Sequence, residues 1–132
     1  MPSHFRELDV WQRSMELAQA VYGLCNGMDA QHRYGLASQL QKSAVSVPSN
    51  IAEGNARRST ADYARFVSIA SGSNAELQTQ LLLAAALKLG PPEDIDKLLT
   101  LTERVGQMLT RLHESLTSRV RSESRVPSAE SR

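Results

Sequence analysis

Residues 46–54 read SVPSNIAEG, and this stretch decides how the chain is organised. It lies inside a longer run whose apolar residues recur at helical spacing, yet it carries Pro48 in its middle and Gly54 at its end. Proline has no amide to bond the carbonyl of Ala44, and its ring crowds that carbonyl. We therefore predict one helix over about 34–53, continuous but kinked at Pro48, with Gly54 in the left-handed conformation that ends many helices.

The kink has two interpretations. In the first it is structural and bends the second helix around its neighbours, while the nearby serine and asparagine side chains bond freed backbone groups. In the second it exposes backbone carbonyls to a ligand. No cluster of ligating side chains stands beside it to support the second interpretation.

Three further helices are predicted around this one. The first opens at Asp9, predicted as its N-cap with Gln12 three residues on, and closes near residues 26–27. The third spans about 60–89, with Ser59 and Asp62 in a capping-box pattern. Its predicted apolar stripe is Tyr63, Phe66, Ala70, Ser73, Leu77, Leu81, Ala84 and Lys88. Gly90 is expected to take the turn after it, and the fourth helix begins at Pro92 with a heptad seam. The fold class is thus all-α, an antiparallel up-and-down four-helix bundle over 1–121, followed by a disordered polar tail at 122–132.

The charge is balanced over the predicted bundle. The whole chain carries 15 basic and 14 acidic residues; residues 119–132 hold four Arg and two Glu, which leaves 11 basic and 12 acidic residues over 1–118. A helical part at −1 lacks the positive charge typical of a nucleic-acid binder. Three features predict a cytoplasmic, non-membrane protein. They are the single cysteine, the lack of an apolar leader and the lack of a long apolar run.

Enzymatic chemistry has little support in the sequence. His4, His32 and His113 lie in three different regions, without a second ligand at helical metal-binding spacing. Cys25 falls on an apolar stripe, where cysteine usually packs. Gly72, within ASGSN at 70–74, is better explained by close helix approach than by phosphate binding. We expect no catalytic residues, no cofactor and no metal.

Apolar residues exceed what four helices of one chain should bury. Residues 81–87 form an unbroken run, and the first helix carries two apolar stripes side by side. One stripe is Leu8, Trp11, Met15, Ala18, Tyr22 and Cys25, and the other is Leu17, Val21, Leu24 and Met28. A monomer's surface helix needs a polar face, so self-association is expected. The predicted oligomer interface comprises Leu82, Leu83 and Ala86 on the third helix and Leu17, Val21 and Leu24 on the first.

Charged residues gather at the turn between the second and third helices. Glu53 either pairs with a nearby arginine and ties the two helices together, or belongs to a polar binding spot. In the second case Arg57, Arg58 and Arg65 are candidate nucleic-acid or anion contacts, and repetition around a ring would add weak contacts together.

Two segments resemble a known family: FRELDVWQRSMELAQAVY at 5–22, and SVPSNIAEG continued by NARRSTADYARFVSIASGSNAELQTQL over 46–81. They are similar to the four-helix-bundle proteins encoded in 23S rRNA intervening sequences, over roughly residues 5–120. A relative in that superfamily is the accessory variability protein of diversity-generating retroelements, a basic pentameric barrel that binds a reverse transcriptase and nucleic acid. The resemblance implies a pentameric bundle without catalytic activity, and this chain departs from the retroelement protein in not being strongly basic.

Two functions therefore stay open. The first is a homo-oligomeric scaffold, an accessory to nucleic acid or to a nucleic-acid enzyme such as a reverse transcriptase. The second is a regulatory or small-ligand-binding bundle, with its site in a central channel or an inter-subunit cleft. A concentrated basic surface would favour the first, and an apolar pocket with convergent polar groups would favour the second.

Overall fold

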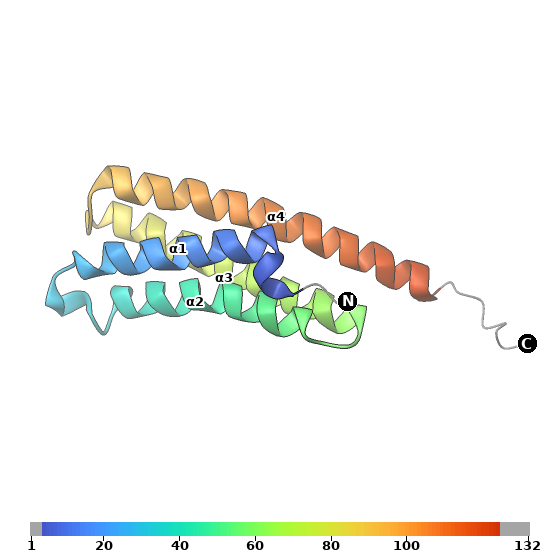
Figure 1. Cartoon of the computed structure of the whole chain (residues 1–132). Coiled ribbons are helices and arrows are strands. Elements are labelled where there is room, and N and C mark those ends of the chain that lie inside the picture. The colour runs from blue at the N-terminus through green and yellow to red at the C-terminus, as the bar shows by residue number, and fades with distance from the viewer. Residues whose placement is uncertain (1–3, 125–132) are drawn as a thin grey trace, which may run out of the picture.

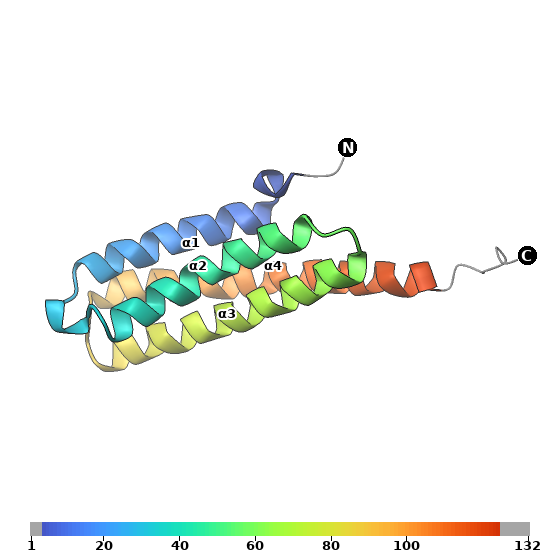
Figure 2. The same cartoon turned by 90° about the horizontal axis from the view of Figure 1, so that it is seen from below.

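The computed structural model describes residues 4–124 of the 132-residue chain. It contains four α-helices and two short 3-10 helices: η1 (Phe5–Glu7), α1 (Asp9–Asn26), η2 (Ala30–His32), α2 (Leu36–Asn55), α3 (Thr60–Ala86) and α4 (Pro92–Ser124). Consecutive helices run antiparallel, and α4 packs back against α1 to close the bundle (Figure 1; Figure 2). No residue in the described range forms a strand. The predicted all-α four-helix bundle is confirmed.

The helix starts follow local hydrogen bonding. At α3 the Ser59 hydroxyl accepts a bond from the Asp62 amide at 3.0 Å, so the predicted cap is present. At α1 the predicted Asp9 cap is wrong, because Asp9 is the first helical residue and Leu8 precedes it without a side-chain cap. Gln12 instead donates to the Arg6 carbonyl at 2.8 Å and ties η1 to the helix.

Pro48 lies inside α2, which runs unbroken from Leu36 to Asn55 without a cis peptide bond in the described range. The predicted continuity is confirmed, and the bend at Pro48 stays a prediction. The Asn50 side-chain amide donates to the Ser46 carbonyl at 2.8 Å and to its hydroxyl at 3.0 Å. Within the described residues no side chain bonds the freed Ala44 carbonyl, so the predicted local compensation at Pro48 stays a prediction.

Gly54 does not end α2 in a left-handed conformation; that prediction is wrong. No glycine in the described range has a positive φ, and the helix continues one residue beyond Gly54. A Cβ at this position would lie 2.7 Å from Phe66 Cβ and 3.0 Å from Tyr63 Cδ1. Glycine is required because α2 and α3 approach each other closely here.

Gly72 has no such neighbour. A Cβ added there meets nothing within 4 Å, and the residue is exposed. The predicted role of Gly72 in close helix approach is therefore wrong. The buried neighbours Ser73 and Asn74 make the inter-helix contacts instead.

The ends of α3 and α4 differ from prediction by a few residues. α3 ends at Ala86 rather than near residue 89, and Lys88, not Gly90, takes the left-handed conformation with φ 57°. α4 reaches Ser124, so the first three residues of the predicted tail are helical, and Thr60 donates to Glu123 at 3.0 Å. The rest of the predicted tail, 125–132, lies outside the described residues.

The core is aliphatic and takes one face from every helix. Its fully buried large side chains are Leu17, Leu40, Ile51, Leu77, Leu81, Ile95, Leu109, Leu116, Val21, Val47, Val67 and Val105. Leu17, Val21 and Leu24 are only 1%, 0% and 8% exposed within a single chain. They are core residues, and their predicted place in an oligomer interface is wrong. The first helix needs a wide apolar face because it contacts both α2 and α4.

Candidate interaction surfaces

The charged cluster at the α2–α3 turn is built around an aromatic ring. The guanidinium carbons of Arg57 and Arg65 lie 4.6 Å and 4.5 Å from the centroid of Phe66, a cation–π geometry. Arg57 donates to Glu53 at 2.8 Å and lies 3.7 Å from Asp62. Arg65 pairs with the same aspartate at 3.0 Å.

This arrangement agrees with the structural interpretation of Glu53, because the Glu53–Arg57–Asp62 chain of contacts joins the end of α2 to the start of α3. Arg58 is exposed and makes no ion pair within the described range. Three arginines against two carboxylates leave a local charge of +1. An anion approaching Arg57 or Arg65 would compete with carboxylates already in place.

The outward side of α3 is nearly free of charge. We define the outer α3 face as Gly72, Ala75, Glu76, Thr79, Leu82, Leu83 and Ala86, which all are exposed and recur at helical spacing. Leu82 and Leu83 are 54% and 48% exposed. Glu76 is the one charged residue between Arg65 and Lys88. The structure thus leaves predicted interface residues Leu82, Leu83 and Ala86 accessible.

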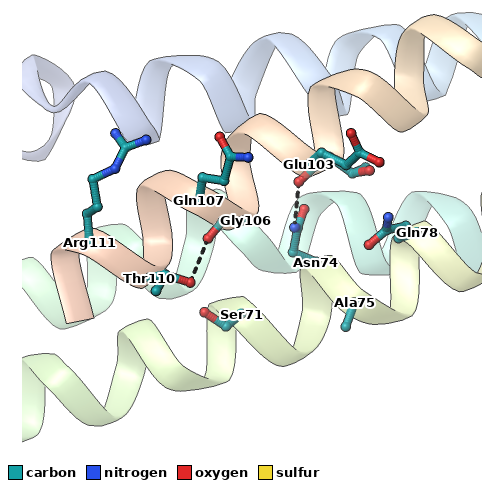
Figure 3. Close-up of a pocket in the computed structure, with 10 residues that line it drawn as sticks. Ser71, Asn74, Ala75, Gln78, Glu103, Gly106, Gln107, Thr110 and Arg111 are labelled. Atoms are coloured by element: carbon teal, nitrogen blue, oxygen red, sulfur yellow. Dashed lines mark hydrogen bonds between the residues drawn. The ribbon is translucent and has the colours of Figure 1, made fainter. Parts of the chain in front are cut away.

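A groove of about 630 Å³ runs between α3 and α4 (Figure 3). Most of the residues that line it are of polar type: Ser71, Asn74, Ala75, Gln78, Thr102, Glu103, Gly106, Gln107, Thr110 and Arg111. Asn74 is 5% exposed and donates through Nδ2 to the Thr102 carbonyl at 2.9 Å. Its Oδ1 is buried and has no hydrogen-bond partner among the described residues. Gly106 leaves room for this amide, since a Cβ there would lie 3.2 Å from Nδ2.

A second hollow, of about 420 Å³, lies over α1 and α2. We call it the α1–α2 hollow; Met15, Ala18, Gln19, Tyr22, Val45, Pro48 and Ser49 line it. None of these side chains is charged, and Tyr22 and Val45 are each 43% exposed. Sequence reasoning placed Met15 and Tyr22 on an apolar stripe but did not recognise that Pro48 and Val45 continue it on the next helix.

Cys25 packs in the core, as its place on the stripe predicts. It is 7% exposed, its thiol lies 3.6 Å from the Ala37 carbonyl, and burial raises its pKa.

Across residues 4–124 no group of three or more His, Cys, Asp or Glu side chains is arranged to hold a metal ion. In the same range no helix has both the length and the apolarity needed to cross a bilayer.

Residues 6–111 match the family described as 23S rRNA-intervening sequence protein. The chain belongs to this family. A search of curated proteins finds no match. Among solved structures, a protein with unknown function from the S23 ribosomal protein family of Bacteroides thetaiotaomicron has a TM-score of 0.74 at 21% identity. The alignment covers 79% of this chain and 97% of that one, and it supports the bundle fold of this intervening-sequence protein.

Proposed function

We propose that this intervening-sequence protein is a non-enzymatic, cytoplasmic scaffold that assembles with copies of itself through the outer α3 face. The observation that carries the proposal is the exposure of Leu82 and Leu83 on a face whose one charge is Glu76. Its family resemblance implies a closed ring of five copies. Neither the family description nor that of the solved neighbour names a reaction.

Burial of this face supplies a driving force for assembly. Fully burying a leucine side chain contributes about 1.5–3 kcal/mol, and Leu82 and Leu83 are each about half exposed in the single chain. Each subunit in a ring would use the face once, and closing the ring would add the contacts together. A monomer has no comparable compensation for leaving the face in water.

Contact with nucleic acid, or with a reverse-transcriptase-like protein, would be an accessory property of the assembled ring. Arg57, Arg58 and Arg65 are its candidate contacts. The carboxylates of Glu53 and Asp62 oppose it, since they already pair with two of the three arginines. Any such binding would depend on repetition of the cluster around the ring.

Light scattering coupled to size exclusion tests the assembly. The wild-type chain should elute with a mass several times 14.5 kDa. Leu82→Glu or Leu83→Glu should reduce the mass to that of one chain, because each places an unpaired charge in an apolar contact. Tyr34→Glu is the matched control, since Tyr34 is 89% exposed in the loop between α1 and α2. A monomeric wild type at micromolar concentration would refute the proposal, and so would normal assembly of both leucine variants.

A second function, binding of a small polar ligand, is favoured by one observation. Asn74 Oδ1 is a buried acceptor without a partner at the wall of the α3–α4 groove. Such an atom requires a donor from water or from a ligand. We expect the Asn74 side-chain amide resonances to shift on addition of free amino acids or nucleosides if this function holds. Resonances that stay unchanged with both amino acids and nucleosides would reject ligand binding in this groove for these two classes of molecule.

A further inference from the structure

The α1–α2 hollow has no partner in the single chain. It combines the exposed side chains of Tyr22 and Val45 with a buried proline, and its polar groups are the Tyr22 hydroxyl and the side chains of Gln19 and Ser49. An apolar hollow of this kind favours an apolar occupant, because a polar one would lose its hydrogen bonds to water without replacement.

The chain cannot fill the hollow with its own outer α3 face. Figure 2 shows α1 and α3 along opposite edges of the bundle, with α2 between them. A second copy can fill it, and the contact is then heterologous: one face of a bundle meets a different face of the next. Contacts of this type generate rings when the rotation closes.

Charges beside the two surfaces are complementary in sign at one end. On α3, Glu76 precedes the two exposed leucines, and Lys88 follows them two residues beyond the end of the helix. Beside the hollow, Lys42 is exposed on α2 one turn before Val45. Because α1 and α2 are antiparallel, Lys42 lies at the end of the hollow where Tyr22 lies.

These charges are available for pairing between copies. Lys42, Glu76 and Lys88 are exposed and make no ion pair within residues 4–124. Docking with Glu76 beside Lys42 pairs opposite signs, whereas the reversed docking brings the Lys88 end of α3 toward Lys42 and opposes like signs.

We propose that the α1–α2 hollow receives the outer α3 face of the next copy, with Glu76 beside the neighbour's Lys42. This inference rests on the proposed self-assembly and adds its second surface and its direction. It also assigns a role to Pro48, whose ring lines the receiving hollow.

Complementation between two variants tests the pairing. Leu82→Glu removes the inserting face and keeps the hollow, whereas Val45→Glu blocks the hollow and keeps the face. Each variant alone should be monomeric, with an unchanged helical circular dichroism spectrum, because both side chains are partly exposed. Mixed in equal amounts at high concentration, they should form a heterodimer of twice 14.5 kDa that grows no further.

The outcomes separate the two proposals. A monomeric wild type overturns both. If the wild type assembles and Val45→Glu assembles like it, self-assembly stands and the hollow is not its receiving surface. If both variants are folded monomers whose mixture stays monomeric, the heterologous pairing is overturned.

The direction of docking has its own test. Lys42→Glu should weaken assembly, and the double variant Lys42→Glu/Glu76→Lys should restore it, because the pair is re-formed with its signs exchanged. Failure of the double variant to recover assembly above Lys42→Glu overturns the assigned direction. Tyr34→Glu again serves as the control for added surface charge.

Discussion

Gly54→Ala should destabilise the bundle, against the usual trend for glycine in a helix. In an unobstructed helix interior this substitution stabilises by about 0.5–1 kcal/mol. At Gly54 the new methyl group would lie 2.7 Å from Phe66 Cβ and 3.3 Å from the Tyr63 carbonyl oxygen. These atoms belong to the first turns of α3 and cannot rotate away, so the two helices must separate.

Forcing a methyl group into such a contact costs about 1–3 kcal/mol. The matched control is Gly23→Ala, also inside a helix, where a Cβ meets nothing within 4 Å. Urea unfolding followed by circular dichroism, at several protein concentrations, gives both free energies. We expect Gly54→Ala to be less stable than wild type by about 1–3 kcal/mol, and Gly23→Ala to be more stable by about 0.5–1 kcal/mol. Equal stabilisation by both changes would show that α2 and α3 are not in close contact at this point.

Three further outcomes are expected. Pro48→Ala should keep the helical spectrum and unfold no more easily, because the new amide can bond the Ala44 carbonyl; loss of helix on circular dichroism would contradict this. The free energy of unfolding should fall as pH rises above about 8.5, because burial raises the pKa of the Cys25 thiol and the thiol of the unfolded chain therefore ionises first. Cys25→Ala should lessen this fall, and an unaltered pH profile of stability in that variant would refute the assignment to Cys25. Binding of duplex nucleic acid in gel-shift assays should be weak, with a log–log salt slope of at most about −2.7 per subunit for three arginine contacts; tight binding that survives both raised salt and Arg57→Ala/Arg58→Ala would contradict it.

The helices could be predicted because their signals are local. Ser59 caps α3 as its spacing to Asp62 indicates, and Pro92 begins α4. The predicted stripe of α3 follows the buried positions from Phe66 to Ala84. Periodicity of 3.6 residues and the chemistry of helix ends determine these features without knowledge of the partner helices.

The surfaces were harder to predict because they depend on which helices pack together. The first helix carries two apolar stripes, and periodicity alone does not say which faces the core. Packing against both α2 and α4 buries Leu17 and Val21 and leaves Tyr22 at the edge. In the same way, the sequence shows Gly54 only as a glycine after a helical pattern. Its role, to allow α2 to approach α3 closely, depends on the position of Phe66 on α3.

Two polar contacts of α3 have a consequence for the alignment of the whole bundle. Ser73 shares a hydrogen bond of 2.7 Å with Ser46 on α2, and the next residue, Asn74, donates to the Thr102 carbonyl on α4 at 2.9 Å. If α2 slid along α3 by one heptad, Gln39 or Glu53 would take the place of Ser46 beside Ser73. If α4 slid by one heptad, the apolar stripes would still match, but the aliphatic Ile95 or Leu109 would take the place of Thr102 beside Asn74. Leaving a buried polar group without a partner costs about 1–3 kcal/mol. Ser73 and Asn74, adjacent on α3, thus select one register of α2 and one register of α4 along α3. The surrounding aliphatic core need not specify these registers.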